Sequence, residues 1–263
     1  MLAIKRELLL EWTYANDNSV FTEEQLSEIS KHVINDSEEY MIIREFWKFI
    51  IYNKLDVMVP YIISVDVAGG LDNDYTAISF IHPKTLKVDA SFRNKTINPT
   101  ELSMVLLDLG TNYFPYTAFV IENNSYGRVV ITNLLYSKIS SRIFYYIPEK
   151  EKDIKTSKAK NKDNKIYGIP TTTKSRAEMI NDLLPMIVND EPEVITCPFI
   201  FSDIRNLERK KNGKIEHRDK QHDDNLFSYL LGRWALGFAK HTNLNSIIMR
   251  SGYDEETQEK NKS

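Results

Sequence analysis

Acidic side chains occupy the positions in this sequence that most directly suggest chemistry. Asp66 ends the apolar run YIISVD, and a glycine-rich turn follows it. Glu122 ends a second apolar run in VIENNSYG, while Asp223 and Asp224 open a helical pattern in QHDDNLFSYLLGRW. An acid in an apolar strand is costly unless it is paired or binds a cation. Asp66 therefore requires a partner, and the later acids are candidates.

Acids at the ends of neighbouring strands and at a helix N-terminus can converge on one crevice. Hard carboxylate oxygens suit Mg²⁺ or Mn²⁺. Two such ions roughly 3.5–4 Å apart activate water and stabilise the leaving oxygen in phosphodiester cleavage. Without a metal, several carboxylates in one pocket repel each other and some stay protonated. Asp74 begins the returning strand eight residues after Asp66 and could face the same crevice.

Each acid also has an ordinary structural explanation. Asp66 could accept hydrogen bonds from turn N–H groups, and Glu122 could pair with Arg128 or with the helix that follows. Asp223 and Asp224 suit the first turn of a helix because the helix dipole favours negative charge there. The order of the three places along an alternating pattern of strands and helices favours the metal site.

The elements that would position these acids form a mixed α/β pattern. Three β-branched segments in close order predict an antiparallel meander. A strand, helices and a hairpin follow, which predicts a mixed sheet with helices on its faces. Residues 1–58 are predicted to be a helical extension, with one helix starting at Thr22 and a second over 40–55. The predicted strands are 61–67, 75–81, 87–93, 116–121 and 143–147; the predicted helices are 99–110, 126–139, 173–188, 198–207 and 222–239; the predicted hairpin is 207–215.

Composition limits the class of protein. The chain has 263 residues and a net charge of −3, so overall positive charge does not drive it to nucleic acid. A single cysteine excludes an intrachain disulfide. No apolar run reaches the roughly 18 residues needed to span a bilayer, and the N-terminus does not resemble a secretion signal.

Basic residues gather before one predicted helix. The polar stretch 149–165 carries seven lysines, including Lys155, Lys158 and Lys160. It precedes TTTKSR, in which Thr172, Lys174 and Arg176 could contact a phosphate backbone. The alternatives are a solvated linker, and pairing of Lys174 and Arg176 with acids on their own helix.

Two further residues could support the acids. His222 directly precedes Asp223 and could bond an aspartate or a phosphate, or simply cap the helix. Asn123 follows Glu122 and could orient its carboxylate, together with Asn124, or cap the next helix.

Several motifs together resemble the nuclease domain of the phage terminase large subunit, an RNase H-like fold. The segment DVAGGLDNDYTAI resembles the family's first aspartate strand, and VIENNSYG resembles its glutamate strand. YGIPTTTKSRAEMINDLL and QHDDNLFSYLLGRW resemble the segments that follow. The resemblance runs from about residue 60 to 240 and implies that Asp66, Glu122 and Asp223 or Asp224 bind metal, with Asp74 auxiliary. Asp223 ranks above Asp224 as the direct ligand.

The resemblance implies an endonuclease that cuts concatemeric viral DNA with two Mg²⁺ or Mn²⁺ ions in the host cytoplasm. Its partners would be double-stranded DNA, a terminase ATPase domain, the small terminase subunit and the portal protein, and no membrane. The chain contains no G-x-x-x-x-G-K-[ST] phosphate loop, so we expect a fragment of a longer terminase. The expected division is 1–58 as the junction with the ATPase, 59–245 as the nuclease and 246–263 as a polar tail.

Two other functions remain open at the level of sequence. One is another RNase H-like nuclease, of the Holliday-junction resolvase or integrase type. The other is a non-catalytic docking module of a packaging motor, in which the acids only cap helices and face solvent.

Overall fold

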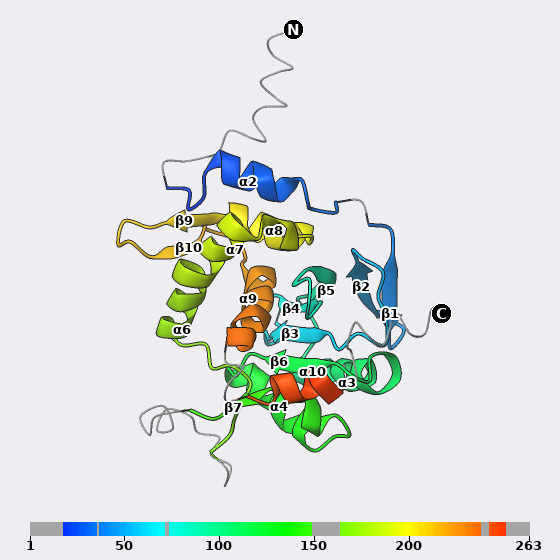
Figure 1. Ribbon diagram of the computed structural model, residues 1–263. Coiled ribbons are helices and arrows are strands. Elements are labelled where there is room, and N and C mark those ends of the chain that lie inside the picture. The colour runs from blue at the N-terminus through cyan, green and yellow to red at the C-terminus, as the bar shows by residue number, and fades with distance from the viewer. Residues whose placement is uncertain (1–17, 36, 72–73, 149–163, 238–241, 251–263) are drawn as a thin grey trace.

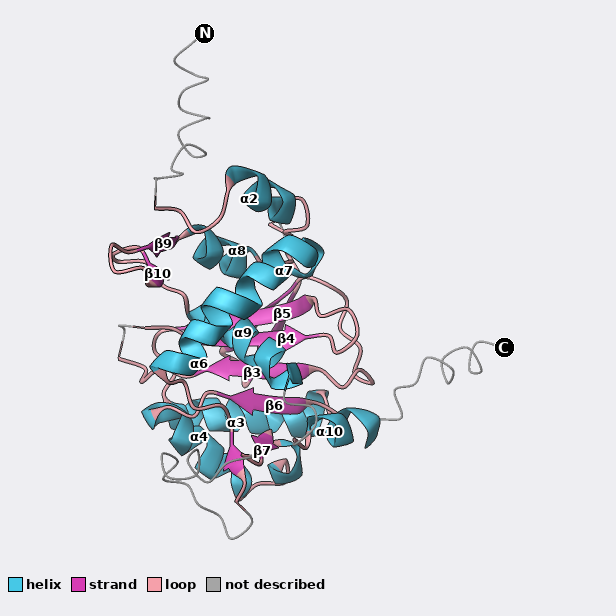
Figure 2. Ribbon diagram, turned by 60° about the vertical axis from the view of Figure 1, so that its left-hand side comes forward, coloured by secondary structure: helices cyan, strands magenta, loops and turns pink. Residues whose placement is uncertain are grey.

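A six-stranded mixed sheet forms the centre of the protein. The computed structural model describes residues 18–35, 37–71, 74–148, 164–237 and 242–250. The strands lie in the order β1-β2-β5-β4-β3-β6, with helices on both faces (Figures 1 and 2). The strands of this sheet are β1 Tyr40–Ile43, β2 Trp47–Ile51, β3 Ile62–Asp66, β4 Thr76–Ile81, β5 Val88–Asn94 and β6 Ala118–Ile121.

The antiparallel meander predicted from the sequence is confirmed as β3, β4 and β5. The pairing of β4 with β5 contains one irregularity, because Ile81 lies opposite Val88 while Phe80 lies opposite Ala90. Asp89 is therefore an extra residue on β5, which is the arrangement of a β-bulge. Its carbonyl accepts the N–H of Tyr52, and its buried carboxylate accepts a hydrogen bond from an asparagine side chain.

Strand β6 completes the sheet on the other side of β3, to which it is parallel. Every residue of β6 is buried, and four of the five residues of β3 are buried. Apolar side chains of the sheet alternate between two core clusters, one under α9 (Asp224–Gly237) and one under α3 (Pro99–Asp108) and α4 (Ser125–Leu135). Burial on both faces explains why these strands are continuous apolar runs.

One predicted helix is wrong. Residues 40–51 form the hairpin β1–β2, which extends the sheet beside β5. The apolar residues that suggested a helix also suit a strand, since several are β-branched. Its turn uses Arg44 and Glu45 at φ 52° and 66°, although neither is a usual turn residue for positive φ. The other predicted N-terminal helix is confirmed, and Thr22 and Gln25 form its capping box.

The remaining elements confirm the predicted alternation, with shifts at their ends. Among the described residues no helix is long and apolar enough to cross a membrane. The division of the chain into three parts stays a prediction. The other helices are α2 Glu23–Ser30, α6 Thr173–Glu178, α7 Leu184–Asp190, α8 Pro198–Arg205 and α10 Leu244–Arg250, with π-helical turns at Leu109–Tyr113 and Met179–Leu183 and 3₁₀ turns at Ser140–Arg142 and Pro192–Val194; the short strands β7 Tyr145–Tyr146, β8 Ile166–Tyr167, β9 Leu207–Arg209 and β10 Ile215–His217 form two small sheets.

Helix α9 lies across β3 and β4, as Figure 2 shows. Its closest approach to the sheet is at Gly232, where a Cβ atom would lie 2.4 Å from Ile81 Cδ1 and 2.8 Å from Ser64 Oγ. The hydroxyls of Ser228 and Ser79 are hydrogen-bonded across the same interface at 2.6 Å. The height of α9 above the sheet is therefore set by a residue without a side chain.

Replacing Gly232 by Ala should destabilise the protein by about 1–3 kcal/mol, because the added methyl overpacks the helix against β3. Gly237 ends the same helix, and a Cβ there would meet no atom within 4 Å. Gly237→Ala is therefore the matched control and should leave stability unchanged or slightly higher. Chemical denaturation of the two variants measures the difference, and equal stabilities would contradict the close approach.

Candidate metal centre

The register of the sheet brings Asp66 and Glu122 together. Val65 lies opposite Ile121, and the N–H of Glu122 donates to the carbonyl of Val65 at 2.9 Å. Asp66 and Glu122 are therefore neighbours on adjacent parallel strands and share a face, since side chains alternate along a strand. Both point to the side covered by α9. The sequence-based expectation that these two acids lie together is met by the geometry.

Several neighbours fix the carboxylate of Glu122. The Thr171 hydroxyl and the Asn124 side-chain amide each donate a hydrogen bond to it. Asn124 also caps α4 by accepting the N–H of Gly127 at 2.6 Å. Gly127 allows this geometry, because a Cβ there would lie 1.7 Å from the carbonyl oxygen of Glu122. The helix therefore starts directly against the acid.

Among the described residues, no hydrogen bond joins the Asn123 side chain to Glu122. Its side chain donates to the Tyr167 carbonyl at 2.8 Å and accepts from Arg128 Nε at 3.2 Å. The orienting residues are thus Asn124, which the sequence had also suggested, and Thr171, which it had placed in a DNA-contact segment. Only the three-dimensional pairing of residue 169 with residue 122 brings Thr171 to the acid.

Asp223 and Asp224 lie at the start of α9 and have different partners. Arg176 Nη2 donates to Asp223 Oδ2 at 2.5 Å, and the guanidinium lies 3.6 Å from the centre of the Phe227 ring. Asp224 Oδ2 accepts the N–H of Tyr75 at 3.3 Å. Arg176 thus bridges the two helices α6 and α9, whereas Asp224 is held by the beginning of β4.

Asp203 is a supporting residue that the sequence analysis missed. It is buried in α8 and accepts the N–H of Leu226 at 3.0 Å and the side-chain amide of Asn225 at 3.2 Å. It therefore satisfies donors in the first turn of α9 from another helix. Burial raises the pKa of Asp203 to about 7. Its signal in the sequence was an acid in the apolar segment PFIFSDIR.

The acids influence each other strongly. Burial raises the pKa of Asp66 well above its ordinary value, and Glu122 raises it further by its charge and by a hydrogen bond. Asp224 and then Asp223 add to this repulsion. Burial likewise raises the pKa of Asp224 to about 6. Removing the proton from Asp66 therefore needs a compensating positive charge.

The donor set fits a hard divalent cation in its chemistry, since the four acids offer only carboxylate oxygens. Their mutual repulsion is what such a cation would relieve. In the part of the chain that the structure describes, however, no group of three or more Asp, Glu, His or Cys side chains stands ready to hold a metal ion. Asp223 is instead bonded to Arg176, and Asp224 to the N–H of Tyr75.

The auxiliary residues lie around this centre. Asp74 is exposed, and its Oδ1 lies 3.9 Å from His222 Nδ1, which in turn is 3.4 Å from Asp224 Oδ2. Burial, followed by the charge of Lys95, lowers the pKa of His222. His222 therefore lies between the acids and a nearby lysine.

The predicted DNA-contact residues divide into three cases. Thr172 caps α6 with its hydroxyl, and Arg176 pairs with Asp223. Lys174 is exposed, and its Nζ lies 3.7 Å from Glu178 Oε1. This agrees with the alternative that Lys174 pairs with an acid on its own helix. Lys155, Lys158 and Lys160 lie outside the described residues.

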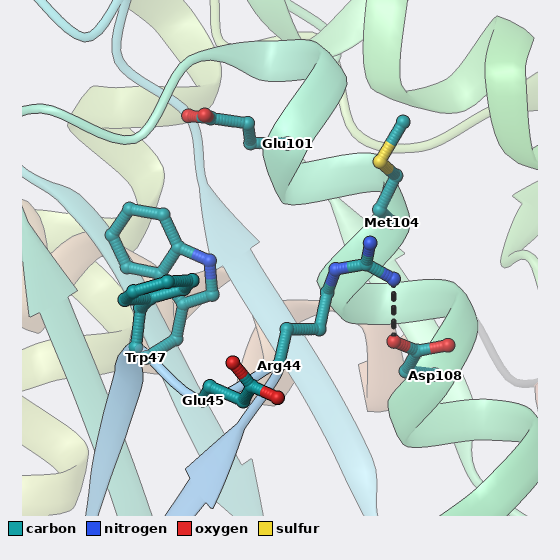
Figure 3. A pocket seen from close by; sticks show the side chains of 7 residues that line it. Arg44, Glu45, Trp47, Glu101, Met104 and Asp108 are labelled. Atoms are coloured by element: carbon teal, nitrogen blue, oxygen red, sulfur yellow. Dashed lines mark hydrogen bonds and ion pairs between the residues drawn. The ribbon is translucent and has the colours of Figure 1, made fainter.

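A second cluster with acids lies at the turn of the β1–β2 hairpin (Figure 3). Arg44 reaches from this turn to α3, where its guanidinium pairs with Asp108 at 2.8 Å. Trp47 and Glu101 line the same pocket. Arg44 therefore balances the charge of Asp108 in this pocket.

Comparison with solved structures identifies the fold. The large terminase nuclease of thermophilic phage G20c with bound magnesium matches at a TM-score of 0.54 and 15% identity, over 82% of this chain and 96% of that chain. The same nuclease with bound cobalt gives the same values. With bound zinc the TM-score is 0.51 at 14% identity, over 80% of this chain and 98% of that chain. No family model matches the sequence, and no curated protein matches it. The likeness confirms the predicted RNase H-like fold of terminase nucleases.

Asp66→Asn should stabilise the metal-free protein by about 1 kcal/mol or more at about pH 8. Because burial raises the pKa of Asp66 in the folded state, the unfolded chain releases this proton at a lower pH than the folded protein does. Stability therefore falls as the pH rises from about 4, the pKa in the unfolded chain, toward the elevated pKa of the folded state. An amide keeps the shape and does not titrate, and its N–H can donate to Glu122.

Urea denaturation of both proteins in EDTA, at about pH 5 and about pH 8, measures this effect. The gain should be larger at the higher pH. Asp219→Asn is the control, since the Asp219 side chain is 99% exposed. A stability loss in Asp66→Asn at both pH values would contradict the raised pKa.

Proposed function

We propose that this chain is a metal-dependent DNA endonuclease of the phage terminase type. The observation that carries the proposal is the register of β3 and β6, which sets Asp66 beside Glu122 under the N-terminus of α9. The fold of terminase nucleases, including structures with bound magnesium, cobalt and zinc, supports the same assignment. The substrate class is double-stranded DNA, cut with little sequence preference.

In this proposal Asp66 and Glu122 are the central metal ligands. Thr171 and Asn124 hold the Glu122 carboxylate in one orientation before any ion arrives. A bound cation would favour the ionised form of Asp66, because a positive charge lowers the cost of ionising it. One or two Mg²⁺ or Mn²⁺ ions would activate water and stabilise the leaving oxygen of the phosphodiester.

The start of α9 supplies the third carboxylate. Asp223 or Asp224 must turn from its present partner to complete the ligand set, with Asp74 as an auxiliary acid. Both lie close enough to the Asp66–Glu122 pair for their charges to raise the pKa of Asp66. His222 would orient Asp224, which it approaches at 3.4 Å.

DNA would reach this centre from the side of α6. Lys174 is exposed at the first turn of that helix, and Arg176 on the same helix pairs with Asp223. When Asp223 turns toward a cation, the Arg176 guanidinium is released for a phosphate. Thr172 would act by fixing the start of α6, since its hydroxyl and its backbone N–H are both engaged with Ser175 in the capping box.

The biological role that accompanies this activity is the cutting of concatemeric viral DNA during genome packaging, in the host cytoplasm. The partners would be a terminase ATPase domain, the small terminase subunit and the portal protein. These roles belong to the proposal as a whole and depend on the nuclease activity.

Asp66→Asn and Glu122→Gln should each lower plasmid cleavage in Mn²⁺ by more than about 100-fold, because each removes a proposed ligand. Asp219→Asn should cut as the wild type does. Supercoiled plasmid, followed on agarose gels with and without EDTA, measures the loss. Cleavage that survives in both variants would rule out this centre.

The same samples separate the alternatives. Preference for a branched over a linear duplex would indicate a junction resolvase. Absence of both cleavage and Mn²⁺ binding in calorimetry would indicate a non-catalytic docking module.

Asp224→Asn should weaken Mn²⁺ binding more than Asp223→Asn. Asp224 raises the pKa of Asp66 more strongly than Asp223 does, and Asp223 is engaged by Arg176. This reverses the ranking suggested by the sequence. Isothermal titration calorimetry of the two isosteric variants, with Asp219→Asn beside them, measures the order, and a larger loss in Asp223→Asn would restore the original ranking.

A further inference from the structure

A basic and aromatic cluster lies near the acids, where β5 ends and β4 begins. It consists of Arg93 at the end of β5, Lys95 just after it, Tyr75 before β4 and Phe199 on α8. The Arg93 guanidinium lies 3.9 Å from the centre of the Phe199 ring and 4.8 Å from that of Tyr75. Lys95 Nζ lies 4.6 Å from the centre of the Tyr75 ring. Two cations thus share one aromatic ring.

The register places this cluster in the same row as the acids. Asp66 lies opposite Ala77 on β4, and Ala77 lies opposite Arg93 on β5. Residues directly opposite one another share a face of the sheet, so Arg93 and Asp66 point to the same side. Two strand spacings separate them by about 10 Å. The residue between them is Ala77, whose small side chain does not separate Arg93 from Asp66.

The charges of the cluster are not balanced by acids within the described residues. The ion pairs of the nearby Asp74 and Asp224 go to His222, and neither Arg93 nor Lys95 pairs with a carboxylate. Lys95 Nζ instead lies 3.4 Å from His222 Nε2, a group that accepts only when neutral. Cations gathered in this way repel each other, and an anion bound between them removes that repulsion.

We propose that Arg93 and Lys95 form a second phosphate-binding strip, which holds the DNA backbone beside the acid centre. This inference rests on the proposed function and names the side of the centre over which the duplex extends. Aromatic rings hold the Arg93 guanidinium in place before binding, which lowers the entropy cost of each phosphate contact. Together with Arg176, which pairs with Asp223, the strip gives the acid centre a second cationic position.

The test is the salt dependence of DNA binding. A fluorescent linear duplex is titrated in EDTA, from about 50 to about 200 mM salt, with wild type, Arg93→Gln, Lys95→Gln and the double variant. Each lost phosphate contact should lower the slope of log K against log salt by about 0.9, and the double variant by about twice that. Arg93→Lys should keep most of the slope because it keeps the charge.

Lys138→Gln is the charge-matched control. Lys138 is exposed beyond the end of α4, and α4 starts at the acid centre and runs away from it. Its slope should equal that of the wild type. If Arg93→Gln fails to fold, as thermal denaturation would report, Lys95→Gln alone decides, since Lys95 follows the end of β5 and lies outside the sheet.

The outcomes separate this inference from the proposed function. Unchanged slopes in the Arg93 and Lys95 variants, with plasmid cleavage by the wild type intact, would overturn the strip and leave the nuclease assignment standing. A wild type that neither binds the duplex nor cuts plasmid would overturn both.

Discussion

The parallel pairing of β3 with β6 is the constraint on which the rest of the site depends. It puts two carboxylates side by side on one face of a sheet that is buried on both sides, where their charges repel in a poorly solvated environment. The groups around the pair reduce the cost of that repulsion. Thr171 and Asn124 donate to Glu122, the pKa of Asp66 is raised, and α9 begins beside the pair with acids of its own. A site built this way sacrifices stability in the absence of a cation, as functional sites commonly do.

The sequence predicted the parts of the fold whose local pattern agrees with their final environment. The meander around Asp66, the strand ending at Glu122 and the helix after Asp223 are of this kind. The hairpin at residues 40–51 was missed because its apolar residues fit two periodicities, and its turn places Arg44 and Glu45 at positive φ without glycine or asparagine. Only pairing with β5 decides between helix and strand there, and no local signal reports that pairing.

Some residues of the candidate site could be predicted from the sequence, and others could not. Spacing along the chain could nominate Asp66, Glu122 and the Asp223–Asp224 pair, since each lies at the end of a recognisable element. It could not nominate Thr171 or Asp203, because their contacts join segments that are distant in sequence. Asp203 lies in α8 and serves the first turn of α9, and its role follows from helix packing. The partners that orient a site are therefore harder to read than the residues that they orient.

The bulge at Asp89 determines on which face of the sheet the later side chains of β5 lie. If every residue of β5 after Val88 paired in turn, with no bulge, Asp89 would lie opposite Phe80 and Arg93 opposite Thr76. The Arg93 side chain would then project from the face covered by α3. The bulge residue Asp89, whose carbonyl accepts the N–H of Tyr52, thus decides which face of the sheet Arg93 occupies. Deleting Asp89 itself would instead leave Val88 opposite Ile81 and Ala90 opposite Phe80 in a regular ladder, so Arg93 would keep its place opposite Ala77 and its side of the sheet.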